Sequence, residues 1–157
     1  MKRKTFLIIS LSVVAVCFLA VFQTNHNTKR DAYAQTNSYQ KNVELLARAV
    51  NGEARGEVYE GQVAVAAVIL NRVDHPSFPN TIAGVIYQPG AFTAVSDGQI
   101  DVPISHNSTV YKACQDAMNG WDPSGGAIYY YNPRTATSKW IYSRPVITTI
   151  GNHIFAK

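Results

Sequence analysis

Two carboxylates stand four residues apart in this chain, Glu53 and Glu57. At about 100° per residue, Glu53 falls beside the apolar stripe of a helix predicted from residue 43 onward. A carboxyl group at the edge of apolar packing loses hydration of its charged form, which raises its pKa and suits it to act as a general acid. Such an acid can protonate the leaving oxygen of a glycosidic bond. In the alternative interpretation, both carboxylates are surface groups paired with Arg48 or Arg55.

Aromatic residues gather near the end of the chain, and aromatic faces pack well against the apolar faces of sugar rings. The set comprises Trp121, Tyr129, Tyr130, Tyr131, Trp140 and Tyr142. Alternation along a strand predicts that Tyr129 and Tyr131 share one face and that Tyr130 lies on the other. One of these faces is equally expected to be core, and Asn132 and Arg144 would then be turn residues rather than sugar ligands.

Metal and thiol chemistry have weaker support. His75, His106 and His153 are scattered, and neither H-E-x-x-H nor C-x-x-C spacing occurs, so we expect no metal site and no cofactor. Cys114 lies on a predicted apolar helix face, where a buried and inert thiol is the ordinary outcome. Since Cys17 lies in an apolar amino-terminal segment, we expect no internal disulfide.

The helices that must position these groups follow from the spacing of apolar residues. The first has a buried stripe made of Val43, Leu46, Ala47, Val50 and Ala54. Residues 60–72 are apolar on nearly every side and predict a buried central helix, although their valines also suit a strand. Residues 81–87 and 108–118 predict two more helices, capped by Asn80 or Thr81 and by Asn107 or Ser108. Residues 88–101 show no helical period.

The end of the chain predicts a small sheet. Residues 127–131 and 146–150 are rich in β-formers, and the pair Gly151-Asn152 would turn the chain into a last strand over residues 153–156. The expected fold class is therefore α+β, a mainly helical domain with a small antiparallel sheet near the C-terminus.

The amino-terminal segment differs from the rest of the chain. Basic residues precede the apolar residues 6–22, and an Ala-x-Ala sequence ends at Ala34, which is the layout of an export signal. We expect residues 1–34 to be a signal peptide and residues 35–157 to form one catalytic domain. Because the polar stretch 23–31 is long for a spacer, an uncleaved membrane anchor is the alternative. The protein would then be secreted or wall-associated, or anchored on the outer face of the cytoplasmic membrane.

The net charge of +4 comes from this same segment. Residues 1–34 hold five of the 14 Lys and Arg residues and one of the ten Asp and Glu residues, which leaves nine of each kind in residues 35–157. Nucleic-acid binding would need an excess of basic charge on one face of the folded domain. We therefore expect no nucleic-acid partner.

Two segments carry a family resemblance, LLARAVNGEARGE at residues 45–57 and GQVAVAAVILNR at residues 61–72. They resemble the SleB/CwlJ cell-wall hydrolases, a family that includes spore cortex-lytic enzymes. The likeness continues through residues 88–92, 97–100, 122–127, 130–133 and 143–155. The resemblance implies a lysozyme-like fold related to lytic transglycosylases, in which one helix-borne glutamate, here Glu53, works without a second catalytic carboxylate.

In the mechanism that the resemblance implies, Glu53 protonates the bond between N-acetylmuramic acid and N-acetylglucosamine, and the muramic C6 hydroxyl attacks to leave a 1,6-anhydro end. The leading hypothesis is a monomeric enzyme acting on peptidoglycan glycan strands in wall turnover or spore cortex lysis, with Glu57 or Asp97 assisting. The residues expected to line the cleft are Phe92, Tyr130, Tyr131, Asn132 and Arg144. The alternatives are an amidase or peptidase on stem peptides, which would need a zinc set or a Cys-His pair, and a non-catalytic wall-binding module.

Overall fold

The computed structural model describes the backbone of residues 2–157 and the side chains of residues 28–157. The chain divides into two units, Met1–Gln40 and Lys41–Lys157, and helix α1 (Lys2–Ala54) contributes to both. Among the described residues, no helix is both long and apolar enough to cross a membrane. The apolar residues 6–22 lie outside the part whose side chains are described, so the export signal or anchor stays a prediction.

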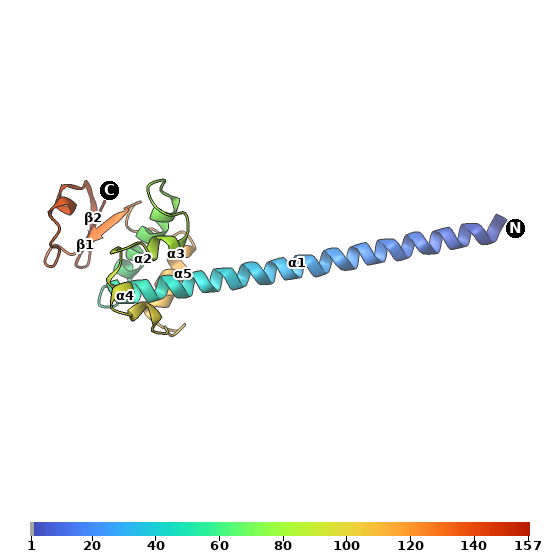
Figure 1. The fold of residues 1–157 in the computed structure, drawn as a ribbon, viewed down its shortest axis with the longest axis horizontal. Helices are drawn as coiled ribbons and strands as arrows, with labels where there is room; N and C mark the ends of the chain where they lie inside the picture. Colours follow the sequence, from blue (N-terminus) through green and yellow to red (C-terminus); the bar gives the residue numbers. More distant parts are fainter. Residues whose placement is uncertain (1) are drawn as a thin grey trace. The chain divides into compact units, whose positions relative to one another are not determined.

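The unit Lys41–Lys157 is mainly helical, with a small sheet, as the sequence predicts (Figure 1). Its further helices are α2 (Tyr59–Asp74), α3 (Ile82–Ile86), α4 (Thr93–Ser96) and α5 (Thr109–Met118), with short 3₁₀ helices η1 (Gln99–Asp101) and η2 (Lys139–Ser143). Its strands are β1 (Tyr129–Tyr131), β2 (Val146–Ile150) and β3 (His153–Ala156).

Helix α2 is the centre of the core. Every residue from 61 to 69 is buried, because α2 packs against α3, α5 and the sheet. Full burial of an aliphatic side chain such as Val63 or Ile69 contributes roughly 1.5–3 kcal/mol relative to its exposure. The predicted central helix is thus confirmed, and the β propensity of its valines is overridden by packing on all sides.

The predicted caps of two helices are confirmed. Thr81 Oγ1 accepts a hydrogen bond from the backbone N–H of Gly84 at 3.0 Å, and Ser108 Oγ accepts one from Tyr111 N–H at 3.2 Å. Each side chain therefore satisfies an N–H group that the first helical turn leaves unpaired.

The absence of helix expected for residues 88–101 is wrong, because α4 and η1 both lie there. Helix α4 is too short to show a 3.6-residue period. Its first N–H groups are satisfied from a distance, by the side chain of Glu53, rather than by a local cap. Such a tertiary cap leaves no mark in the local sequence.

The sheet has the strand order β1-β3-β2 with antiparallel neighbours, so the last strand lies in the middle. Tyr130 pairs with Phe155 across β1 and β3, and Ile150 pairs with His153 across the turn between β2 and β3. Gly151 makes that turn at a φ of 57°, in the left-handed region that glycine adopts without strain. The predicted carboxy-terminal hairpin is confirmed.

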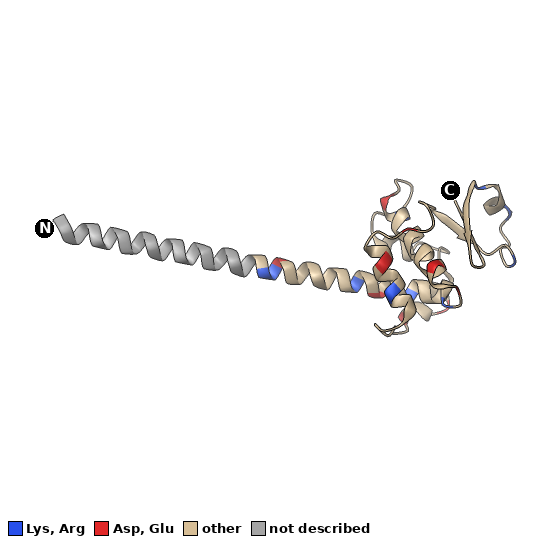
Figure 2. Ribbon diagram, turned by 180° about the vertical axis from the view of Figure 1, so that it is seen from behind, with Lys and Arg blue, Asp and Glu red and all other residues tan. Residues whose placement is uncertain are grey.

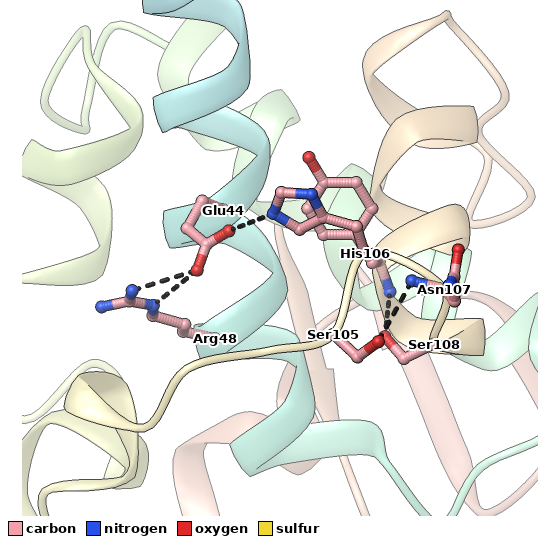
Figure 3. A network of polar contacts seen from close by, with 7 residues as sticks. Glu44, Arg48, Ser105, His106, Asn107 and Ser108 are labelled. Atoms are coloured by element: carbon pink, nitrogen blue, oxygen red, sulfur yellow. Dashed lines mark hydrogen bonds and ion pairs between the residues drawn. The ribbon is translucent and has the colours of Figure 1, made fainter.

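A polar network attaches the loop before α5 to the last turns of α1 (Figure 3). Arg48 donates to Glu44 Oε1 from Nε and Nη2 at 3.3 and 3.0 Å, while His106 Nε2 lies 3.1 Å from Glu44 Oε2. The His106 ring stacks on Tyr111 of α5, with centroids 4.5 Å apart. Arg48 therefore forms its ion pair with Glu44. The alternative interpretation of the sequence, in which Arg48 pairs with Glu53 or Glu57, is wrong for Arg48.

Acidic and basic residues both occur in the helical part of the unit Lys41–Lys157, whereas the part with the sheet carries only basic ones (Figure 2). Residues 123–157 contain Arg134, Lys139, Arg144 and Lys157 and no Asp or Glu. The balance of nine acidic and nine basic residues therefore holds for residues 35–157 as a whole and not for each part.

Candidate active site

The carboxylate of Glu53 lies at the carboxyl end of α1 and is fixed by the start of α4. Its Oε1 accepts hydrogen bonds from Thr93 N–H at 2.9 Å, from Thr93 Oγ1 at 2.8 Å and from Ala94 N–H at 3.4 Å. Gly52 permits this contact, because a Cβ at that position would overlap Ala94. One oxygen of the carboxylate is therefore fully engaged by protein donors.

The second oxygen of Glu53 faces Tyr130 of β1. The Tyr130 hydroxyl donates to Glu53 Oε2 at 3.2 Å, and the ring packs against His153 and Phe155 with centroids 5.2 and 6.3 Å away. Burial, followed by the nearby charge of Glu53, raises the pKa of Tyr130 well above its ordinary value. Tyr130 therefore stays a neutral donor aimed at Oε2.

These groups open into a cleft of about 490 Å³. Its walls come from the end of α1, the start of α4, strand β1 with the loop that follows, and the start of β3. The lining residues are Gly52, Glu53, Glu57, Arg72, Ala91, Thr93, Tyr130, Tyr131, Asn132, Thr135, Ala136 and His153. Polar groups predominate on this wall, which suits a hydroxyl-rich and amide-rich ligand.

Glu57 lies in the same cleft but is held differently from Glu53. Its Oε2 accepts from Asn152 N–H at 2.8 Å, its Oε1 accepts from Asn152 Nδ2 at 3.1 Å, and Gln62 Nε2 donates to its backbone carbonyl at 3.1 Å. Burial raises the pKa of Glu57, but the hydrogen bonds from Asn152 and the nearby His153 outweigh that effect, so the pKa lies below its ordinary value. Glu57 is therefore an ionised group at neutral pH.

His153 stands between Glu57 and Tyr130. Its Nδ1 lies 3.9 Å from Glu57 Oε1, is buried and has no hydrogen-bond partner. Burial lowers the pKa of His153, although the charges of Glu57 and Glu53 act in the opposite direction. The imidazole is therefore neutral at neutral pH.

Arg72 of α2 is a charged residue that lines the Glu53 cleft. Its Nε donates to the carbonyl of Ile128 at 2.7 Å, and its guanidinium lies 5.3 Å from the centroid of Phe78, 5.6 Å from Phe92 and 5.9 Å from Tyr129. Burial lowers the pKa of Arg72, while Tyr130, Tyr129 and Glu53 oppose the shift. This cation neutralises part of the acidic charge of the cleft.

A second hollow of about 330 Å³ adjoins the cleft and shares Arg72, Ala91 and Tyr130 with it. Trp140 lines this hollow with half of its surface exposed, and its ring meets Tyr129 edge-on at 5.2 Å. The two hollows therefore share one wall, and together they offer a larger lined volume than the Glu53 cleft alone.

The structure brings five of the predicted site residues into the cleft: Glu53, Glu57, Tyr130, Tyr131 and Asn132. The other three lie elsewhere. Asp97 is exposed at the end of α4 and accepts hydrogen bonds from Gln99 N–H and Nε2 at 3.0 and 2.8 Å. Phe92 is 3% exposed and packs beneath Arg72, and Arg144 lies over Trp140 with its guanidinium carbon 5.0 Å from the ring centroid. Phe92 and Arg144 thus support cleft-lining groups rather than lining the Glu53 cleft themselves.

Sequence reasoning missed three functional candidates, Thr93, Arg72 and His153. A lone arginine at the end of an otherwise buried apolar helix was a usable signal for Arg72, since an arginine there needs partners. Thr93 and His153 gain their meaning from residues 40 and 96 positions away in the chain, and no local pattern marks them.

The remaining titratable candidates of the sequence are accounted for. Cys114 is fully buried, and burial raises the pKa of its thiol, so the predicted inert cysteine is confirmed. Among residues 28–157, no three His, Cys, Asp or Glu side chains gather where a metal ion could be held.

Comparison with known sequences agrees with this geometry. The chain is 63% identical over 122 residues to the spore cortex-lytic enzyme of Bacillus cereus, which covers 77% of this chain and 46% of that protein. It is 63% identical over 115 residues to the spore cortex-lytic enzyme of Bacillus subtilis, covering 73% of this chain and 37% of that protein. The chain thus spans less than half the length of these relatives. The cell wall hydrolase CwlJ of B. subtilis is 29% identical over 120 residues.

Solved structures show the same fold. The catalytic domain of the germination-specific lytic transglycosylase SleB from Bacillus anthracis matches with a TM-score of 0.72 at 63% identity, over 75% of this chain and 95% of that one. The catalytic domain of the B. cereus SleB protein matches with a TM-score of 0.71 at 64% identity. The predicted lysozyme-like α+β fold is therefore confirmed. Residues 56–156 match the family described as Cell Wall Hydrolase, and the chain belongs to that cell wall hydrolase family.

Proposed function

We propose that this protein cleaves the glycan strand of peptidoglycan between N-acetylmuramic acid and N-acetylglucosamine, as a lytic transglycosylase with Glu53 as its acid. The observation that carries the proposal is the carboxylate of Glu53 in an open cleft, with Oε1 engaged by three donors and Oε2 facing Tyr130. The names of the relatives support spore cortex peptidoglycan as the substrate and germination as the occasion.

The unequal surroundings of the two oxygens of Glu53 decide which one carries the proton. Oε1 already accepts three hydrogen bonds, two from the backbone N–H groups of Thr93 and Ala94, which can only donate, and one from the Thr93 hydroxyl. A proton on Oε1 would face these donors, whereas a proton on Oε2 faces the cleft and the rotatable hydroxyl of Tyr130, which can accept as well as donate. Oε2 is therefore the oxygen that delivers the proton to substrate.

The reaction then follows ordinary glycoside chemistry. Oε2 gives its proton to the glycosidic oxygen as the bond from that oxygen to the muramic C1 breaks, and positive charge develops on the sugar ring. The muramic C6 hydroxyl later forms the new bond to C1 and returns its proton to the Glu53 carboxylate. Acid and base are thus the same residue, and the product ends in a 1,6-anhydro sugar.

The two adjoining hollows suit a polymeric sugar. Trp140 is half exposed in the second hollow of about 330 Å³, and Tyr131 and Asn132 line the Glu53 cleft of about 490 Å³. A ring stacked on Trp140 and an amide bonded to Asn132 would fix the register of the strand before the chemical step. Arg144, packed over Trp140, keeps that ring in place.

The two other acidic candidates have different parts in this proposal. Asp97 is occupied by Gln99 and lies outside the cleft lining, so we assign it a structural role at the end of α4. Glu57 is ionised and bonded to Asn152, so it has no proton to donate. Of the three carboxylates Glu53, Glu57 and Asp97, we therefore assign proton transfer to Glu53, through the Oε2 that faces the Tyr130 hydroxyl in the cleft.

We place the protein outside the cytoplasm as a monomer, where its substrate lies. The export-signal pattern in residues 1–34 supports this location, either with cleavage or as an anchor on the outer face of the cytoplasmic membrane. Peptidoglycan is the one macromolecular partner that we propose.

The test compares Glu53→Gln with the parent protein on purified peptidoglycan, measuring both release of soluble fragments and binding to the insoluble wall. Glutamine keeps the shape of the side chain and its acceptor for Thr93 but has no acidic proton. We expect cleavage to disappear and binding to persist. Glu60→Gln, an exposed carboxylate at the start of α2, is the matched control and should cleave normally. Cleavage that survives in Glu53→Gln removes the role assigned to Glu53.

A further inference from the structure

The connection between β1 and β2, residues 132–145, carries three basic side chains that the acid step does not use. Arg134, Lys139 and Arg144 are all exposed, and this β1–β2 loop contains no Asp or Glu. The ion pairs found among residues 28–157 all involve Glu44 or Glu57, and none of them includes a cation of the loop. The three positive charges are therefore not neutralised by carboxylate side chains of the described residues.

The two sides of the Glu53 cleft differ in charge. Residues 35–122, which include the helical side, hold nine acidic and five basic residues, a net charge of −4. Residues 123–157, which form the sheet side, hold four basic residues and no acidic one. Figure 2 shows this separation, with red segments confined to the helical part. An anionic ligand at the cleft is therefore repelled by the helical side and attracted to the β1–β2 loop.

The backbone that carries these cations is fixed by hydrogen bonds. Asn132 Oδ1 accepts from the N–H of Arg134 at 2.9 Å, and the Asn132 carbonyl accepts from Ala136 N–H at 2.9 Å. The Tyr142 hydroxyl lies 3.1 Å from the carbonyl oxygen of Ala136, and its ring meets Tyr131 of β1 edge-on at 5.2 Å. The loop is thus folded onto the sheet, which reduces the entropy that its backbone would lose on binding a ligand.

The β1–β2 loop is continuous with the lining of the cleft. Asn132, Thr135 and Ala136 line the Glu53 cleft, and Trp140 lines the second hollow. Arg144 lies over Trp140, with its guanidinium carbon 5.0 Å from the ring centroid. A glycan strand bound in the two hollows would therefore bring the substituents of its sugars beside the exposed cations of the loop.

We propose that Arg134, Lys139 and Arg144 bind the carboxylates of the stem peptides that peptidoglycan carries on its muramic sugars. The inference rests on the proposed glycan-cleaving function and adds a part of the substrate that is recognised outside the cleft. A guanidinium can bind a carboxylate through two parallel hydrogen bonds, and a lysine ammonium attracts it as a point charge. The consequence is a preference for stretches of glycan that bear peptides.

The stem peptide is favoured over other anions of the wall because of where it is attached. It is joined through the lactyl group to the muramic sugar whose bond is proposed to be cleaved, so a strand in the cleft presents its peptide at the cleft edge. A phosphate of teichoic acid offers similar chemistry to arginine, but its position is not tied to the bond beside Glu53. The experiment separates these two sources.

The effect should appear in binding rather than in the chemical step. Exposed charge pairs each contribute modestly and are screened by salt. Removing two of the cations should therefore raise KM about fivefold and leave kcat unchanged, which is the pattern of an interaction made equally in the ground and transition states. The difference should largely vanish in about 1 M NaCl.

The experiment compares two double variants of the full chain that lose the same charge. Arg134→Gln/Lys139→Gln removes two cations of the loop, and Lys41→Gln/Lys112→Gln removes two exposed cations from α1 and α5. Arg144 is kept, because it also packs on Trp140. Equal melting temperatures would establish that both variants are folded. Arg134→Lys/Lys139→Arg, which keeps both charges, should retain the KM of the unmodified chain.

Two substrates free of teichoic acid decide between the ligands: purified peptidoglycan, and the same glycan after an amidase has removed its stem peptides. We expect the loop variant to raise KM on the peptide-bearing substrate alone and the control variant to change neither. An equal rise on both substrates would show that the loop binds the sugars. A rise found only on walls that retain teichoic acid would assign the loop to phosphate. Either result, or an unchanged KM, would overturn the inference.

Binding measured without cleavage keeps this inference separate from the proposed function. In the Glu53→Gln background, the Kd for insoluble peptide-bearing glycan should weaken about fivefold with the loop variant, and the Kd for stripped glycan should not change. Absence of glycan cleavage by the unmodified chain would overturn the proposed function, whereas equal Kd values with and without the loop cations would overturn only the role of the β1–β2 loop.

Discussion

The Tyr130 hydroxyl donates a hydrogen bond to Glu53 Oε2 at 3.2 Å, although 77 residues separate the two in sequence. This contact joins the helical part of the unit Lys41–Lys157, which carries Glu53, to the sheet, which carries Tyr130. The surroundings of Glu53 are thus assembled by the tertiary fold, and its neighbours Thr93, Arg72 and His153 come from α4, α2 and β3. Each of these neighbours gives a separate test.

The hydroxyl of Thr93 is one of the donors that fix Glu53 Oε1, at 2.8 Å. Thr93→Val keeps the shape of the side chain and the backbone N–H but removes that donor. We expect kcat to fall roughly tenfold, since this donor would stabilise the carboxylate that forms as Glu53 gives up its proton, with little change in stability because Thr93 is exposed. Thr93→Ser restores the hydroxyl and should recover most of the rate. Equal rates for the valine and serine variants would contradict the role of this donor.

Arg72 stabilises the structure through its Nε hydrogen bond and its planar guanidinium, neither of which lysine has. Arg72→Lys loses the Nε donor to Ile128 and the flat face that packs among Phe78, Phe92 and Tyr129. We expect a loss of about 2 kcal/mol in the free energy of unfolding, measured by denaturant titration.

The control for this prediction is Arg55→Lys. Arg55 is exposed, and its guanidinium donates a hydrogen bond to Gln99 Oε1. It should change stability by less than about 0.5 kcal/mol. If Arg72→Lys also lost less than about 0.5 kcal/mol of unfolding free energy, the positive charge alone would be sufficient, and the planar guanidinium would not be needed.

Substitution of Gly151 should be unfavourable both because its φ is positive and because a Cβ there would meet Glu57, and Gly90 serves as a control that shares only the positive φ. Gly151 and Gly90 both have positive φ, 57° and 72°, but a Cβ at Gly151 meets the carboxylate of Glu57 whereas a Cβ at Gly90 meets nothing within 4 Å. Gly90→Ala should therefore cost about 1 kcal/mol from backbone strain alone. Gly151→Ala should cost roughly 1–2 kcal/mol more and should also lower activity by displacing Glu57. Equal melting temperatures for the two variants would show that the turn does not constrain Glu57.

The pH dependence of folding stability should fall in two stages on acidification. The pKa of His153 is lowered in the folded state, so the unfolded chain takes up a proton first and stability declines as pH drops below about 6.5. The pKa of Glu57 is also lowered, so its contribution is present above about pH 4.5 and is lost as pH falls towards its folded-state value. Melting temperature measured against pH should lose the upper stage in His153→Gln and weaken the lower stage in Glu57→Gln. An unchanged profile in both variants would contradict the assigned shifts.

The fold was largely predictable because its helices and hairpin leave local signals. The apolar stripe ending at Ala54, the continuous apolar run of α2 and the caps Thr81 and Ser108 each reflect contacts within a few residues. Helix α4 was not predictable, because the group that caps it, Glu53, lies 40 residues away.

The site was predictable where one helix carries it. The position of Glu53 beside an apolar stripe follows from helix periodicity. Strand alternation predicts Tyr130 and Tyr131 on opposite faces, yet both line the Glu53 cleft, so alternation alone did not predict the aromatic part of the site. Asp97 was a poor candidate because its partner is Gln99, two residues on, and Phe92 was a poor one because a buried aromatic and a ligand-binding aromatic look alike in sequence. His153 depends on a turn that brings Asn152 and Glu57 together over 95 residues.

The most direct test of the central claim is mass spectrometry of the glycan ends released from purified peptidoglycan in heavy-oxygen water, comparing the unmodified chain with Glu53→Gln. The account predicts 1,6-anhydromuramic ends that carry no label from the solvent, and their complete absence in the variant. Labelled reducing ends would show that water rather than the C6 hydroxyl attacks C1. Anhydro ends that persist in Glu53→Gln, or fragments cut only in the stem peptides, would contradict Glu53 as the acid of a lytic transglycosylase.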